Sequence, residues 1–118
     1  MIDKANIAGF GLEKLFRGKE DLIGAEIGCD MGLTTEFLLK HLKFNRLICV
    51  DPWQPYEGLN TGAVFTTKQN AMNHHVEFIK RVHPYMDKIA IFQMTSKSAA
   101  EIVDDDWLDF VFIDANHA

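Results

Sequence analysis

The period of the hydrophobic positions switches several times along the chain. Four short segments are apolar almost throughout, as strands covered on both faces of a parallel sheet usually are. They span residues 22–27, 46–51, 89–92 and 108–114. Before and between them, apolar residues recur every three or four positions, which indicates helices over residues 3–16, from a cap at Thr34 or Thr35 to about 42, after 68, and from 98 to the acidic run 104–106.

The predicted helices carry recognisable ends and faces. Thr34 or Thr35 is expected to cap the second helix, and the pair Ser98 and Glu101 has the spacing of a capping box. For the third helix we expect a buried stripe of apolar side chains at spacings of three and four. Its members are Met72, Val76, Ile79, Val82 and Met86.

The alternation of helices and strands predicts an α/β fold in which a parallel sheet has helices on both faces. Residues 1–118 contain no repeat and no linker, so we expect a single domain. The segment 52–68 lacks a clear period and is long for a compact domain, which is typical of functional loops.

Composition and charge narrow the classes of function. The 118 residues are 47% hydrophobic and 25% charged, with a net charge of −5, so we expect neither nonspecific nucleic-acid binding nor attraction to anionic membranes. No segment reaches the roughly 18 apolar residues of a membrane span. Cys29 and Cys49, the only cysteines, both lie in apolar stretches. We therefore expect buried thiols in a cytoplasmic protein.

The turn after the first predicted strand, residues 26–32, combines an acidic residue with two glycines. Gly28 and Gly32 allow a close backbone approach to a ligand, and Glu26 and Asp30 supply carboxylates. The three-glycine dinucleotide fingerprint is missing, which favours a zwitterionic ligand over a diphosphate. The alternative is a plain glycine turn between a strand and a helix.

Asp51 ends the second predicted strand. A carboxylate at this place can accept both hydroxyls of a ribose, as the acidic residue does in nucleotide-binding folds. The alternative is a solvated aspartate that caps the turn before Pro52. Trp53 could lie against an adenine ring or pack beneath the loop.

These features together resemble the class I S-adenosylmethionine-dependent methyltransferases, and within them the family-24 group. The likeness rests on the turn at 26–32, on Asp51, on the segment Asp-Phe-Val-Phe-Ile-Asp-Ala-Asn-His at 109–117 and on Met-Thr-Ser at 94–96. It extends over nearly the whole chain. The resemblance implies a Rossmann-like sheet in which these four strands take the order 3-2-1-4.

The resemblance also implies roles for individual residues. Glu26, Gly28, Asp30 and Gly32 would surround the methionine part of S-adenosylmethionine, and Asp51 would hold the ribose. The remaining cofactor residues implied by the family are Pro52, Trp53, Thr95, Ser96 and Asp114.

The end of the fourth predicted strand resembles that of cation-dependent O-methyltransferases. Asp114 would lie near the reacting methyl group and could bind Mg²⁺. His117 takes the place of a catalytic lysine, and imidazole can accept a proton near neutral pH. We therefore expect Asp114 and His117 to be catalytic, with methyl transfer to an oxygen or nitrogen of a small-molecule acceptor.

Methyltransferases of this fold have a seven-stranded sheet, so we expect this four-stranded portion to be truncated or to close its sheet by oligomerisation through the fourth strand. Two other functions stay open: a non-catalytic S-adenosylmethionine-binding module or partner subunit, and a nicotinamide-dinucleotide-binding fragment. His74, His75 and His83 are expected to lie on solvated helix faces rather than in a metal site.

Overall fold

The structure is a computed structural model that describes residues 11–55 and 67–114. Residues 11–16 are helical, so the described part of the predicted 3–16 helix is confirmed. The elements that follow are β1 (Leu22–Ile27), α2 (Leu33–His41), β2 (Phe44–Val50), α3 (Lys68–Val82), η1 (His83–Lys88), β3 (Ile89–Phe92), α4 (Ser96–Ala100), η2 (Asp105–Trp107) and β4 (Phe110–Ile113). Of the predicted loop 52–68, residues 56–66 lie outside the described residues.

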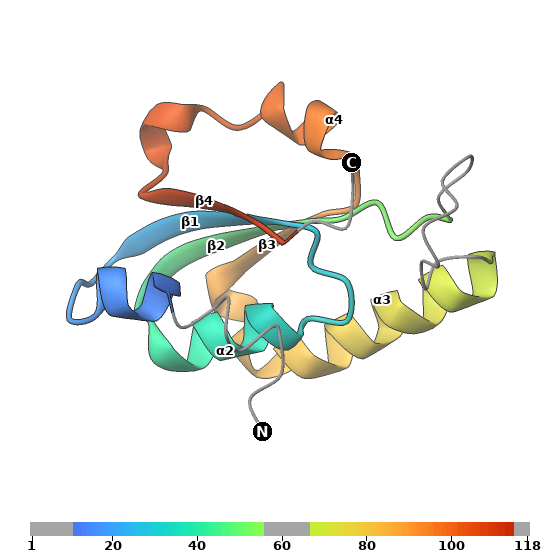
Figure 1. The fold of residues 1–118 in the computed structure, drawn as a ribbon, viewed down its shortest axis with the longest axis horizontal. Helices are drawn as coiled ribbons and strands as arrows, with labels where there is room; N and C mark the ends of the chain where they lie inside the picture. Colours follow the sequence, from blue (N-terminus) through green and yellow to red (C-terminus); the bar gives the residue numbers. More distant parts are fainter. Residues whose placement is uncertain (1–10, 56–66, 115–118) are drawn as a thin grey trace.

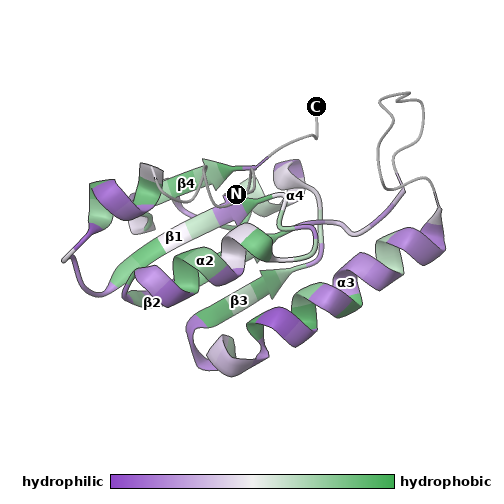
Figure 2. Ribbon diagram, turned by 60° about the horizontal axis from the view of Figure 1, so that its bottom comes forward, coloured by the Kyte–Doolittle hydropathy of each residue, from purple (hydrophilic) through white to green (hydrophobic). Residues whose placement is uncertain are grey.

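The four strands form one parallel sheet in the order β3-β2-β1-β4, as the sequence predicts (Figure 2). Glu26 of β1 is in register with Cys49 of β2 on one side and with Phe112 of β4 on the other. Because all strands run in the same direction, their carboxyl ends meet at one edge of the sheet. The residues that follow β1, β2 and β4 are therefore neighbours in space.

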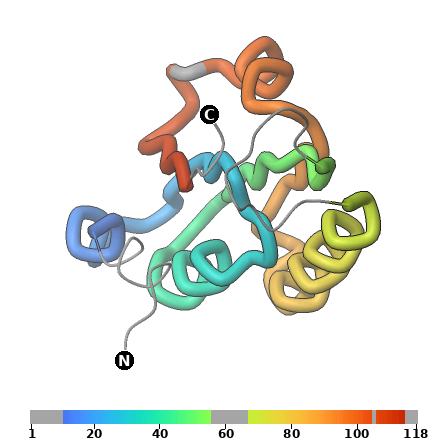
Figure 3. The backbone as a smooth tube through the Cα atoms, turned by 45° about the vertical axis from the view of Figure 1, so that its right-hand side comes forward, coloured from blue at the N-terminus to red at the C-terminus, as the bar shows by residue number. Residues whose placement is uncertain are grey.

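Helices cover both faces of this sheet, and the two coverings differ in size. α2 and α3 lie side by side against one face, and the shorter α4 lies with η2 over the other (Figures 1 and 3). We call these the α2–α3 face and the α4 face. None of the described helices is both long and apolar enough to cross a membrane.

The α2–α3 face holds the larger hydrophobic core. Leu38 of α2, Leu47 of β2 and Phe78 of α3 are completely buried there. At the β4 edge, the Phe110 ring lies over Gly24, where an added Cβ would approach the ring to 2.4 Å. Gly24 therefore makes room for an aromatic side chain from the neighbouring strand.

The α4 face is packed more loosely. Its buried cluster contains only small and medium side chains, and a cavity of about 360 Å³ lies between α4 and the sheet. The cavity is lined by Ala25, Ile27, Ile48, Val50, Ser96, Lys97, Ala99, Ala100, Val103, Leu108 and Val111. On the same face, Ile113 at the end of β4 is 64% exposed.

The predicted buried stripe of α3 is largely wrong. Met72 is 58% exposed, and Val76 and Met86 are exposed as well, whereas Val82 is buried. The residues of α3 that are buried against the sheet are Ala71, Phe78 and Val82. Of the five predicted residues, Val82 is buried and Ile79 is half-buried against the core, so the prediction holds at these two and fails at the other three. The observed buried side of α3 is rotated toward Ala71 and Phe78. Two apolar stripes competed in this sequence, and tertiary packing decided between them.

The predicted helix caps are also wrong. Gly32, in the left-handed region with φ of 87°, precedes α2, and Thr34 and Thr35 lie inside the helix with their side chains buried. α4 begins at Ser96 after Thr95, whose hydroxyl accepts the backbone N–H of Ser98 at 3.2 Å. α4 ends at Ala100, well before the acidic run. The observed N-caps, Gly32 and Thr95, thus lie two or three residues before the residues that local patterns suggest as caps.

Candidate functional site

The turn between β1 and α2 depends on its glycines for reasons of backbone geometry. Gly28 and Gly32 have φ of 88° and 87°, which side chains other than glycine rarely adopt. The Gly28 N–H donates to Val50 O at 2.8 Å, which joins the turn to the end of β2. An added Cβ on Gly32 would lie 2.9 Å from the Phe78 ring. Both glycines are thus required by the fold itself.

Glu26 is a completely buried carboxyl group at the end of β1. Its Oε1 accepts the hydroxyl of Thr35 at 2.5 Å, while Oε2 has no hydrogen-bond partner among the described residues. The pKa of Glu26 is raised to about 8, chiefly by burial and also by the carboxylates of Asp114 and Asp51, while the hydrogen bond from Thr35 opposes the shift. The group is therefore protonated at neutral pH in this conformation, with one oxygen unsatisfied.

Asp114 follows β4 and lies beside the same helix turn. Its Oδ2 accepts the hydroxyl of Thr34 at 3.2 Å, and its N–H donates to Ile27 O at 2.9 Å. The adjacent threonines of α2 thus contact carboxyl groups from two different strands. Sequence reasoning treated Thr34 and Thr35 as caps and missed this role. The available signal was a pair of polar residues on the helix directly after the glycine turn.

Asp51 follows β2 and is only 1% exposed. Its Oδ1 accepts the N–H of Trp53 at 2.7 Å, and its Oδ2 accepts the N–H of Asp30 at 3.0 Å. The carboxylate therefore joins the turn after β1 to the segment after β2. The alternative of a solvated aspartate that caps the turn is therefore half right, because Asp51 does cap the turn through the Trp53 N–H but its side chain is buried.

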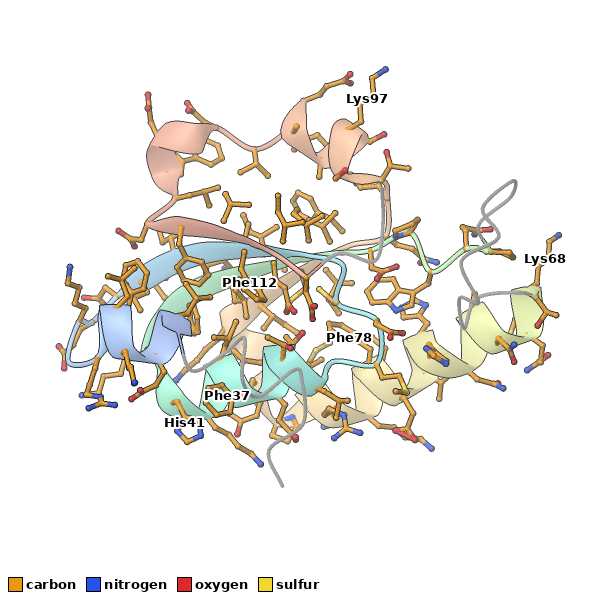
Figure 4. All side chains as sticks on the ribbon, in the orientation of Figure 1. Phe37, His41, Lys68, Phe78, Lys97 and Phe112 are labelled. Atoms are coloured by element: carbon orange, nitrogen blue, oxygen red, sulfur yellow. The ribbon has the colours of Figure 1, made fainter. Side chains whose placement is uncertain are left out.

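Trp53 packs beneath the loop rather than lying open. It is 3% exposed, its indole N–H donates to Asp30 O at 2.8 Å, and its ring stacks on His75 with centroids 4.3 Å apart. Phe78 contacts the same indole at 4.9 Å between centroids and points from α3 toward the sheet (Figure 4). Of the two readings of Trp53, this geometry favours packing. Pro52, the residue between, is half-buried.

The expectation that His74 and His75 are solvated is wrong. The Nδ1 of His74 contacts a carboxylate oxygen of Asp30, and His75 covers the Trp53 ring. Desolvation lowers the pKa of His75, although Asp51 opposes this shift. His83 is exposed, as expected. The sequence signal for His75 was its spacing from Phe78 and Ala71, which places it on the buried stripe of α3.

Several predicted residues lie apart from this cluster or outside the described chain. Thr95 and Ser96 are exposed at the start of α4. His117 lies outside the described residues, so its predicted catalytic role stays a prediction. Among residues 11–55 and 67–114, no three His, Cys, Asp or Glu side chains group closely enough to hold a metal ion. The described residues thus give no support to the predicted Mg²⁺ site at Asp114.

Cys29 lies in the glycine turn as a buried free thiol. Its Sγ lies 3.5 Å from Glu26 O and 3.7 Å from Val50 O. Burial raises the pKa of the Cys29 thiol well above its usual value, so the sulfur is protonated at neutral pH. Cys29 therefore fills space under the turn and is not an activated nucleophile.

Comparison with known proteins assigns most of the chain to one family. No curated protein matches the chain. Residues 25–118 match the model of a family described as a methyltransferase domain, number 24 of that series. The match covers β2, β3 and β4 completely and β1 from its fourth residue onward. The chain therefore belongs to this family of methyltransferase domains.

Proposed function

We propose that the residues at the ends of β1, β2 and β4 bind S-adenosylmethionine. The observation that carries the proposal is the unpartnered Oε2 of Glu26, buried beside two further carboxyl groups. Within residues 11–55 and 67–114, none of the groups that shift the pKa of Glu26 is a cation. A buried polar oxygen without a hydrogen-bond partner is costly. A bound cation would remove that cost, because it lowers the pKa of the carboxyl group and donates to the ionised oxygen.

S-adenosylmethionine has the groups that this set of acceptors requires. Its ammonium and sulfonium are positive, and its ribose offers two hydroxyl donors. Glu26 is suited to the ammonium of the methionine part, and Asp51 to the ribose hydroxyls, as the family resemblance implies. The diphosphate of a nicotinamide dinucleotide would instead meet Asp51 and Asp114 with like charge, which disfavours that alternative.

The chain's own residues would bind and orient this ligand. Thr35 directs the Glu26 carboxyl group, and Thr34 directs Asp114, so α2 sets the direction of both side chains. Because Asp51 is 1% exposed, the surface over its carboxylate must open when a ribose binds. When bound, S-adenosylmethionine supplies a methyl group on a cationic sulfur, ready for an oxygen or nitrogen nucleophile of a small-molecule acceptor. Holding the donor in one orientation is the main contribution we assign to these residues.

Calorimetric titration of the chain with S-adenosylhomocysteine tests the proposal. We expect micromolar affinity, which corresponds to about −8 kcal/mol. Asp51→Asn keeps the shape but removes the charge, and it should weaken binding at least about tenfold because a charged acceptor is lost. The matched control is Asp106→Asn, which alters an exposed carboxylate within η2 and should leave the affinity unchanged.

One further titration and an assay of methyl transfer separate the alternatives. Nicotinamide dinucleotide should not bind, and tight binding of it in place of S-adenosylhomocysteine would contradict the proposal. Absence of any binding by a folded chain would contradict it equally. Retained binding without methyl transfer to any acceptor would instead assign the chain as a non-catalytic cofactor-binding module.

A further inference from the structure

We propose that His74 and His75, adjacent on α3, are positioning residues that hold the turn after β1 and the segment after β2, and so fix the direction of the Asp51 carboxylate. The inference rests on the proposed function, because the ligand it concerns is the one assigned to Asp51. Neither histidine belongs to the motifs that carry the family resemblance. Both come from the helix that separates β2 and β3 in the chain.

The first contact holds the turn after β1. An ionised carboxylate only accepts hydrogen bonds, so we assign the ring proton of His74 to Nδ1, which donates to Asp30 Oδ1. Asp30 has φ of 52°, a left-handed conformation that is unfavourable for a residue with a side chain. The contact with α3 offsets that cost. It thereby keeps the Asp30 N–H aimed at Asp51 Oδ2, 3.0 Å away.

The second contact holds the segment after β2. Trp53 also has a left-handed backbone, with φ of 46°, and its N–H donates to Asp51 Oδ1 at 2.7 Å. The His75 ring lies against the Trp53 indole at an interplanar angle of 11°. His75 therefore packs against the indole, holds it in the core and keeps the Trp53 N–H in place. Both backbone donors to Asp51 thus depend on one turn of α3.

The two segments are also joined to each other. The Trp53 indole N–H donates to Asp30 O at 2.8 Å, which closes a ring of contacts through Asp30, Asp51 and Trp53. Successive residues of a helix point about 100° apart, so adjacent histidines can reach two different loops. This arrangement explains why two neighbouring polar side chains lie on the sheet side of α3.

Tryptophan fluorescence tests the positioning role without any ligand. The chain has two tryptophans, and Trp107 is exposed, so Trp107→Phe leaves Trp53 as the only reporter. In that background, His74→Ala and His75→Ala should each move the Trp53 emission to longer wavelength as the indole meets water. His83→Ala removes an exposed histidine at the start of η1 and is the matched control, with no expected change.

Ligand affinity provides the second readout. His74→Ala should weaken S-adenosylhomocysteine binding about tenfold, because a hydrogen bond to a charged group is lost. His74→Gln retains a donor and should restore most of the affinity, and His75→Phe retains the stacked ring and should do the same. A purely structural role would lower the unfolding midpoint of the alanine variants without this rescue.

The outcomes distinguish the two proposals. If the wild-type chain binds no S-adenosylhomocysteine but the histidine variants still shift the Trp53 emission, the proposed function fails and the positioning role stands. If the histidine variants match His83→Ala in emission and in affinity, the positioning role is overturned. Loss of affinity that neither His74→Gln nor His75→Phe restores also overturns it.

Discussion

The two faces of the sheet differ in how tightly they are packed and in what they contribute to the site. The α2–α3 face buries Phe78 completely, and it supplies Thr34, Thr35, His74 and His75 as partners of the strand-end residues. The α4 face has a five-residue helix over a cavity of about 360 Å³.

The candidate site therefore lies against the face whose helices bury the larger hydrophobic core. A binding group is held in one orientation only when the side chains behind it are themselves immobilised by packing and hydrogen bonds. Thr35 meets this condition because it lies on a buried turn of α2. The α4 face has few buried side chains that could immobilise a binding group. It therefore contributes at most exposed residues such as Thr95 to the candidate site.

The largest expected effect is a loss of stability on the α2–α3 face. Phe78→Ala should lower the free energy of unfolding by about 3–5 kcal/mol, because it removes a fully buried ring and leaves a cavity. Leu108→Ala, at a half-buried position beside the existing cavity of the α4 face, should cost about 1–2 kcal/mol. Urea unfolding followed by circular dichroism measures both. Equal losses would remove the contrast between the two faces.

A change of intermediate size is expected at Glu26, where a substitution should raise rather than lower the free energy of unfolding. The pKa of Glu26 is raised from 4.5 to about 8 in the folded chain, so the unfolded state loses its proton first. Stability is therefore fully present below pH 4.5 and is lost as the pH rises toward 8, with a cost of about 3 kcal/mol at pH 7.

Glu26→Gln removes this ionisation while leaving the side chain nearly the same size. It should raise the free energy of unfolding at pH 7 by about 2 kcal/mol, since the amide adds a donor that partly offsets the gain. The stability of the variant should also depend less on pH between 4.5 and 8. A variant with the same pH dependence as the wild type would show that Glu26 ionises normally in the folded chain.

The smallest effect is expected on the outer side of α3. Met72→Gln should change the free energy of unfolding by less than about 0.5 kcal/mol, because the side chain is 58% exposed. The hydrophobic pattern alone would have placed Met72 in the core, where such a change costs several times more. Thermal unfolding of Met72→Gln beside Phe78→Ala decides between the two orientations of the helix. A large loss in the methionine variant would favour the stripe that the pattern predicts.

Strands were predicted better than helix orientations, and the reason is physical. β1 and β3 have the predicted bounds, since a continuous apolar run between polar turns allows few other placements. The orientation of α3 depends instead on which of two apolar stripes meets the sheet. That choice involves Phe78 beneath Trp53 and beside Gly32, contacts between residues far apart in the sequence.

The same distinction applies to the candidate site. Glu26, Asp51 and Asp114 lie at the ends of β1, β2 and β4. Their positions could be predicted because the local hydrophobic pattern locates the end of a strand. Their helix partners Thr35 and His74 could not be found in this way, since each contact depends on how a helix rotates against the sheet. Sequence motifs therefore located the carboxyl groups but not the side chains that orient them.

We expect a ligand to bind at the ends of β1 and β2 and not in the cavity of the α4 face. Backbone amide chemical-shift mapping of the ¹⁵N-labelled chain during titration with S-adenosylhomocysteine tests it most directly. We expect the largest shifts at the amides of Gly28, Asp30 and Trp53, which follow β1 and β2. Shifts confined to residues that line the α4 cavity, such as Val103 and Leu108, would contradict it.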